Sequence, residues 1–150
     1  MKITKILAPT DLSKLSRAAV RYAVETALAQ GAEVLVYTVI SEDGDWFDKH
    51  DALNPAHALM PKQKLRLDEF VKESCAEFIG KVNIRQAVEV GVPYKAIVNK
   101  SAEENADLIV MSTHGRTGVE QFMLGSVTAK VVARASCPVL SIRPKVQDVG

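Results

Sequence analysis

The amino-acid sequence predicts an α/β fold: an open five-stranded parallel sheet with helices on both faces. Three observations support this prediction. Apolar, strand-like runs alternate with helix-like runs over all 150 residues, no linker or internal repeat interrupts them, and the runs at 32–40 and 106–113 are almost continuously apolar. Such runs are typical of strands buried on both faces, and the alternation requires crossover helices between parallel strands. We therefore expect one domain over residues 1–150.

The first half of the chain contains two predicted strands around one long helix. The run ITKILAP at 3–9 predicts the first strand, and the apolar run at 32–40 predicts the second. The helix between them spans 13–30, where Ser13 is a suitable N-cap and alanines recur every four residues. Gly31 ends this helix, because glycine readily adopts the left-handed conformation found after many helices.

The second half of the chain repeats the pattern. In chain order we predict a helix at 62–79, a strand at 82–90, a helix at 93–105, a strand at 106–113, a helix at 125–135 and a strand at 137–144. The strand at 82–90 alternates between apolar and polar residues and ends at Gly91, so we expect it nearer an edge of the sheet.

The segment at 41–60 departs from this alternation. It carries five acids, one lysine, two histidines and the only tryptophan of the chain, and it is long for a connection in a compact domain. We expect a surface loop, with a lid or a partner contact as the alternative. Its acids and histidines lack the spacing of a calcium loop, so we expect no metal site there.

Composition and charge exclude several classes of function. The formal net charge is +1 and no basic stripe is present, which argues against a nucleic-acid partner. The sequence contains no apolar run of 18 residues, so it predicts no membrane-spanning helix. An acid and a proline near the N-terminus come too early for a signal peptide. Cys75 and Cys137 lack metal-ligand spacing and are expected to be reduced and buried. These features favour a cytoplasmic location.

The expected strand order, 3-2-1-4-5, places a ligand site where the first and fourth strands meet. In open α/β sheets, ligands bind beyond the carboxyl ends of the strands, at the point where the order reverses. Here those ends are Pro9-Thr10-Asp11 and Ser112-Thr113-His114-Gly115.

A glycine-rich stretch follows the fourth strand at this point. Gly115 is followed by nine residues and then by Gly125-Ser126, which opens a predicted helix. Glycine lets main-chain NH groups approach a phosphate closely, and a helix N-terminus adds free NH groups and partial positive charge. This is not a Walker loop, because no lysine follows Gly125. Arg116 could reach a terminal phosphate or remain solvated, and a glycine-punctuated loop before a capped helix is the alternative for the whole stretch.

Two stretches resemble the universal stress protein family: KILAPTDLS near the N-terminus and the run from Gly91 to Pro144, GVPYKAIVNKSAEENADLIVMSTHGRTGVEQFMLGSVTAKVVARASCPVLSIRP. The resemblance covers essentially the whole chain. It implies a Rossmann-like fold of the adenine nucleotide alpha hydrolase-like type. ATP-binding members resemble the pattern Gly-x2-Gly-x9-Gly-Ser/Thr. Its second glycine falls on Gly115 and its last pair on Gly125-Ser126, whereas Ser112 stands where the first glycine would be.

The resemblance also implies further nucleotide contacts. An aspartate near the nucleoside matches Asp11, which could equally cap the first helix, and a main-chain contact to adenine matches Val39 or Ile40. His114 is expected to pack or to bond the backbone rather than to act as a base. The candidate cofactor-binding residues are Pro9, Thr10, Asp11, Val39, Ile40, Ser112, His114, Gly115, Arg116, Gly118, Gly125, Ser126 and Val127.

The resemblance further implies a homodimer that pairs the last strand through residues 138–143. An apolar edge strand left bare would favour aggregation, which is a physical reason to cover it. The function we expect is that of a small cytoplasmic regulator that binds ATP, with or without Mg, and does not turn it over. The alternative is a stress-protein dimer that binds no nucleotide and acts through protein partners. An enzyme is the third reading, but Asp11 is the one acid that the sequence places in the crevice.

We expect Ser112 to be compatible with ATP. The run before it is continuous strand, so its φ should be negative and glycine is not required there. Its hydroxyl could bond a ribose oxygen.

Overall fold

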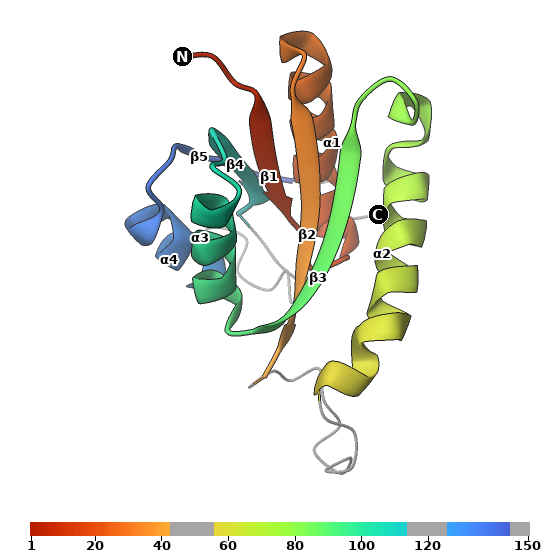
Figure 1. The fold of residues 1–150 in the computed structure, drawn as a ribbon, viewed down its shortest axis with the longest axis vertical. Coiled ribbons are helices and arrows are strands. Elements are labelled where there is room, and N and C mark those ends of the chain that lie inside the picture. The colour runs from red at the N-terminus through yellow and green to blue at the C-terminus, as the bar shows by residue number, and fades with distance from the viewer. Residues whose placement is uncertain (43–55, 114–125, 145–150) are drawn as a thin grey trace.

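The computed structural model describes residues 1–42, 56–113 and 126–144. They form one parallel sheet in the order β3-β2-β1-β4-β5 (Figure 1). The strands are β1 (Lys5–Pro9), β2 (Glu33–Ser41), β3 (Ile84–Gly91), β4 (Leu108–Ser112) and β5 (Val139–Ile142). The predicted strand order is confirmed, and the alternating strand β3 does lie at an edge of the sheet, opposite β5.

Within these described ranges, four α-helices connect the strands: α1 (Lys14–Gln30), α2 (Met60–Ser74), α3 (Pro93–Glu103) and α4 (Ser126–Arg134). Two short 3-10 turns, η1 (Ala56–Leu59) and η2 (Ala76–Phe78), flank α2. Helices α1 and α2 pack on one face of the sheet, and α3 and α4 pack on the other. The described helices include none that is both long and apolar enough to cross a bilayer.

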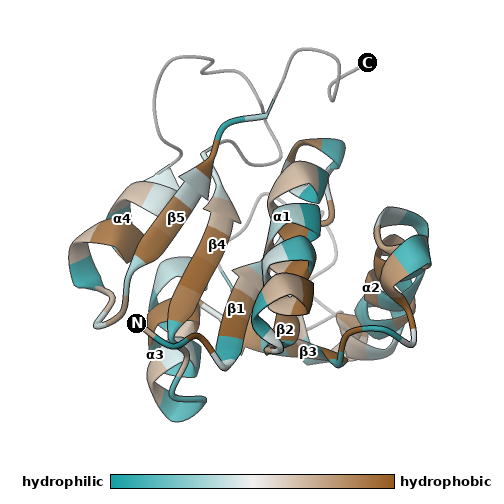
Figure 2. Cartoon of the chain, turned by 90° about the horizontal axis from the view of Figure 1, so that it is seen from above, coloured by the Kyte–Doolittle hydropathy of each residue, from teal (hydrophilic) through white to brown (hydrophobic). Residues whose placement is uncertain are grey.

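The strand side chains supply two cores, one for each face of the sheet. In β2, Val34 and Val36 are fully buried with α1 and α2, whereas Leu35 and Tyr37 are buried with α3 and α4. This alternation follows from the two-residue period of a strand, and covering both faces requires an apolar residue at nearly every position. Figure 2 shows the result as brown strands between helices that are teal on their outer sides.

The predicted limits of α1 are confirmed by its caps. The Ser13 side chain accepts a hydrogen bond from the main-chain NH of Ser16, and Gly31 ends the helix at φ 68°. The alanines and valines on its inner side let the helix lie close to the sheet, with Ala19, Ala23 and Ala27 fully buried.

The predicted helix at 62–79 differs from the structure at both ends. Helix α2 begins at Met60 and ends at Ser74, and the chain leaves helical geometry at the buried Cys75. A 3-10 turn follows, so that Phe78 packs against the core that α1 and α2 share with the sheet. The helical spacing of the apolar residues continues into this turn, which is why periodicity alone extends the helix too far.

Candidate functional site

The turn between β1 and α1 is rigidly held by short polar side chains. The main-chain NH of Thr10 donates to the Tyr37 carbonyl at 2.9 Å. The Thr10 hydroxyl lies 2.7 Å from the Ser16 hydroxyl and accepts from the Leu12 NH at 3.0 Å. Leu12 itself has φ 66°, an unusual conformation for a leucine that these bonds help to maintain.

Asp11 is half-buried in this turn. Its Oδ1 accepts from the Ser13 NH at 3.0 Å and from the Ser13 hydroxyl. The helix cap is therefore Ser13, and Asp11 braces the cap rather than bonding the helix directly. Among the residues that the structure describes, no hydrogen bond to the second carboxylate oxygen, Oδ2, is found, which leaves that oxygen able to accept from a ligand hydroxyl.

The end of β4 lies beside this turn. Ile6 and Leu7 of β1 pair with Leu108 and Ile109 of β4, and continuing this register sets Ser112 level with Thr10. Ser112 is the last residue of β4, and its backbone keeps the negative φ that we expected, since the positive values in described non-glycine residues fall elsewhere.

Ser112 ties β4 to two helices. Its hydroxyl donates to the Leu15 carbonyl of α1 at 3.3 Å, and its carbonyl accepts from the Thr128 hydroxyl of α4 at 2.7 Å. Both side chains are buried. The first turns of α1 and α4 are thus fastened to the same strand end, where the order of the sheet reverses.

The end of β2 forms one wall of this region. Pro9, the last residue of β1, pairs with Tyr37, and β2 continues for four more residues to Ser41. Val39 and Ile40 lie in this extension, with their side chains buried on opposite faces of the sheet. Only their main chain is left to face a ligand, as a main-chain contact to a base would require.

The structure brings together part of the predicted site. Around the β1–β4 junction it places Pro9, Thr10, Asp11, Ser112, Ser126 and Val127, with Ser126 exposed at the start of α4 and Val127 half-buried beneath it. Val39 and Ile40 lie in the extension of β2, and the other five predicted residues, His114, Gly115, Arg116, Gly118 and Gly125, lie outside the described residues. No group of three or more potential metal ligands occurs in residues 1–42, 56–113 and 126–144.

Sequence reasoning missed Ser16 and Thr128, whose hydroxyls fasten the two helices to the strand ends. Each follows a predicted helix start, at 13 or 125, by three residues, which is a signal for a first-turn polar contact. Glu42 was assigned only to the acidic loop, yet it directly follows β2, and its NH donates to the Gly91 carbonyl at 3.2 Å. This places a second acid at the carboxyl edge of the sheet, on the β3 side of β2.

A doubly wound parallel sheet with its polar strand ends at the reversal of strand order defines a Rossmann-like α/β protein. The chain belongs to the universal stress protein family, whose family profile matches residues 2–143. It is 34% identical over 149 residues to the universal stress protein MJ0531 of Methanocaldococcus jannaschii, covering 93% of this chain and 81% of that protein.

Solved structures share the fold over nearly the full length of the chain. The universal stress protein UspA from Lactobacillus plantarum superposes with a TM-score of 0.79 at 23% identity, covering 95% of this chain and 99% of that one. MJ0577, from the same archaeon as MJ0531, gives 0.74 at 26% identity, covering 97% and 99%. A universal stress protein solved in complex with cAMP gives 0.62 at 24% identity, covering 97% and 100%.

Proposed function

We propose that this protein binds an adenine nucleotide, with ATP as the first candidate, in the crevice between β1 and β4. The observation that carries the proposal is the geometry of Asp11. One oxygen is used to hold the turn, and the other has no partner among the described residues, at the point where open α/β sheets bind ligands. A carboxylate oxygen in that position suits the hydroxyls of a ribose.

The other parts of a nucleotide have matching positions. In this proposal the main chain of Val39 or Ile40, in the extension of β2, would contact adenine. Ser126, at the start of α4, offers a hydroxyl and a helix N-terminus to phosphate oxygens. Gly115 and Gly125 would add main-chain NH groups, and Mg, where it accompanies ATP, would offset the phosphate charge. Membership of the family supports this assignment, and the relative solved with cAMP shares the fold, which makes adenine nucleotides the first ligands to test.

The protein acts in this proposal by binding and not by turnover. Hydrolysis of ATP needs an oriented water and usually acids that hold the metal. Asp11 is the described acid at the β1–β4 junction, and one of its oxygens is already engaged. Nucleotide binding would instead change the surface that a cytoplasmic dimer presents to its partners.

The proposed dimer uses β5. Val139, Leu140 and Ile142 are each only half-buried although they lie in the sheet, and β5 is an edge strand. A second copy pairing along residues 138–143 would cover these side chains and satisfy the outer edge of the strand.

A dimer that binds no nucleotide is the second candidate function, and Ser112 is the observation that favours it. Its Cβ and hydroxyl occupy the position of the first glycine in the ATP-binding pattern, and the hydroxyl is already bonded to Leu15. In that case the site would be filled by protein, and partners would be recognised without a nucleotide signal.

Two measurements distinguish these functions. Mass spectrometry of small molecules released from the purified, denatured protein should find an adenine nucleotide. Calorimetry of nucleotide-free protein should then show ATP binding more tightly than GTP, because main-chain groups at an adenine edge discriminate against guanine. A protein that carries no nucleotide and binds none at millimolar concentration contradicts the first function and supports the second.

A further inference from the structure

Helices α3 and α4 hold a compact group of cations around one aromatic ring. We call it the Tyr94 cluster: Tyr94 and Lys95 of α3, and Lys130 and Arg134 of α4. The Nζ of Lys130 lies 4.9 Å from the centre of the Tyr94 ring, the Cζ of Arg134 lies at 5.1 Å and the Nζ of Lys95 at 5.9 Å. At these distances the ring attracts a cation, so Tyr94 serves as the platform of the cluster. The two helices lie side by side in both views (Figures 1 and 2).

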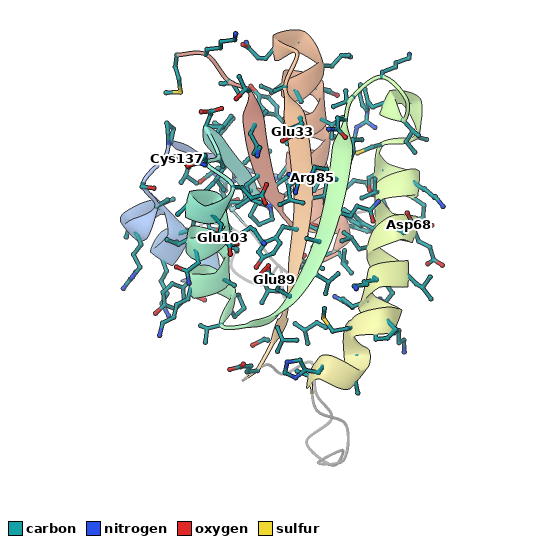
Figure 3. The ribbon with its side chains drawn as sticks, viewed as in Figure 1. Glu33, Asp68, Arg85, Glu89, Glu103 and Cys137 are labelled. Carbon is teal, nitrogen blue, oxygen red and sulfur yellow. The ribbon has the colours of Figure 1, made fainter. Side chains whose placement is uncertain are left out.

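No described acid pairs with these three cations. Helix α4 contains no acid, and Glu103, the one acid of α3, and Glu104, its C-cap, have other partners. Glu103 pairs with Lys100 at 3.1 Å, and Glu104 pairs with Arg85 at 2.7 Å. Glu89 of β3, which lies toward Glu103 in Figure 3, pairs with Lys100 at 2.7 Å. Among the described residues, Glu89, Glu103 and Glu104 are therefore already paired with other cations.

Two features of the cluster are electrostatically unfavourable for the chain alone, although the helix dipole favours Arg134 in the last turn of α4. Lys130 and Arg134 stand four residues apart on α4, where like charges destabilise a helix. Lys95 lies in the first turn of α3, where the helix dipole disfavours a cation. A bound anion would relieve both repulsions, which is the reason to look for an external partner.

The surroundings of the cluster indicate which anion fits. The outer side of α4 also exposes Ala129 and Ala133 beside Lys130. Val132, which is 47% exposed, lies on the opposite flank of the helix, away from the Tyr94 cluster. The surface is therefore partly basic and partly apolar. A nucleic acid prefers a longer basic stripe, and much of the remaining described positive charge is already paired with acids. The paired cations are Lys5, Arg17, Arg21, Lys72, Arg85 and Lys100.

We infer that the Tyr94 cluster and the outer side of α4 form a docking surface for an acidic, partly apolar segment of a partner protein. The carboxylates of the segment pair with Lys95, Lys130 and Arg134, and its apolar side chains cover Ala129 and Ala133 on the outer side of α4. The surface is built from helix exteriors and does not depend on the nucleotide site, so it stands apart from the proposed ATP binding.

The test uses the full-length protein and a fluorescein-labelled octapeptide, Glu-Glu-Phe-Glu-Glu-Leu-Glu-Glu. A matched peptide carries glutamine at every glutamate. Anisotropy titrations at about 50 mM salt should show at least tenfold tighter binding of the acidic peptide. Raising the salt to about 300 mM should weaken that binding, because exposed charges are screened.

Charge-reversal variants locate the surface. Lys130→Glu with Arg134→Glu should lower the peptide affinity at least tenfold. The control is Lys62→Glu with Lys64→Glu on α2, which changes the net charge equally at two exposed lysines for which the structure shows no ion pair. The control should change the affinity less than threefold. Tyr94→Phe should bind as the wild type does, whereas Tyr94→Leu, which removes the platform, should lose about fivefold. Circular dichroism verifies that each variant is folded.

Several outcomes would overturn the inference. Equal losses in the α2 and α4 variants mean that net charge alone drives binding. If the acidic peptide binds no more tightly than its glutamine control, the proposed docking surface for an acidic segment is excluded. A labelled single-stranded oligonucleotide and vesicles containing phosphatidylserine are the competing probes. If either binds more tightly than the peptide and is weakened by the α4 variants, the surface belongs to another class of partner.

Discussion

The Ser112 hydroxyl donates a hydrogen bond to the main-chain carbonyl of Leu15, at 3.3 Å, across the junction of β4 and α1. Ser112 stands where ATP-binding members of the family have the first glycine of their pattern. In this chain the side chain at that position joins two elements of the fold, and the Ser112 carbonyl binds a third through Thr128. Ser112, the residue that departs from the ATP-binding pattern, is therefore also a structural link beneath the site.

Asp107 should make stability depend on acid pH. Its Oδ2 accepts from the Thr4 NH at 2.8 Å, the Thr4 hydroxyl at 2.9 Å and the Lys5 NH at 3.1 Å, which fastens the start of β1 beside β4. The bond from the Thr4 NH, followed by those from the Thr4 hydroxyl and the Lys5 NH, lowers the pKa of the Asp107 carboxyl. A lowered pKa in the folded state gives stability that is present above the unfolded pKa of about 3.9 and is lost as pH falls through the folded value.

The Asp107→Ala variant tests this assignment. Its thermal midpoint should lie below that of the wild type at pH 7, and the difference should shrink as the pH falls below about 4. Asp107→Asn keeps one acceptor oxygen and loses the charge, so it should lie between the two. If the difference in thermal midpoint between the variant and the wild type stayed constant from pH 7 to pH 2, the carboxylate charge would contribute nothing to stability.

Gly125→Val should weaken ATP binding while the protein stays folded. A valine would place a branched side chain where a phosphate must approach the main chain, and we expect at least a tenfold loss, about 1.4 kcal/mol. Ala129→Val adds similar bulk on the exposed side of α4 and should leave the affinity unchanged. Equal ATP affinities for the wild type and Gly125→Val, measured by calorimetry, would show that the phosphates bind elsewhere.

Leu140→Asp should disrupt the proposed dimer, because it introduces a charge into the middle of the pairing strand. Sedimentation at micromolar concentration should show a dimer for the wild type and a monomer or insoluble protein for the variant. Leu65→Asp makes the same change on α2 at a side chain that is 68% exposed, and it should remain dimeric. A monomeric wild type would exclude the β5 dimer.

The sheet could be predicted because each buried strand and helix end carries a local sequence pattern that indicates its burial or its capping. The continuous apolar run of β2 requires burial on both faces, and Ser13 and Gly31 mark the ends of α1 by their own chemistry. The shorter strands were predicted up to two residues too long at their ends, where polar residues such as Thr4, Asp107 and Arg143 already stand. Such limits depend on where neighbouring strands stop, which a single segment does not reveal.

The details of the site could not be predicted in the same way. Leu12 adopts a positive φ without glycine or asparagine, because Thr10 and the packing of its own side chain hold it there. The bonds from Ser112 to Leu15 and from Thr128 to Ser112 join residues 97 and 16 positions apart. They exist only because the fold brings three segments together, and the spacing of glycines gives no sign of them.

Substitutions at Ser112 decide between the two candidate functions. Ser112→Gly removes the bond to Leu15, with a loss of about 1 kcal/mol of stability, and adds roughly 0.5–1 kcal/mol for glycine in a strand. Because Ser112 already has a negative φ, glycine relieves no strain, and we expect the ATP affinity to change by less than about tenfold. Ser112→Val keeps a good strand former, loses the hydroxyl and enlarges the side chain, so it should weaken ATP binding more than glycine does. Calorimetry of the three proteins, with denaturant melts to separate folding from binding, gives the answer. A wild type that binds no ATP at millimolar concentration, beside a Ser112→Gly variant that binds it in the micromolar range, would make Ser112 a blocking residue. The protein would then act through partners without nucleotide.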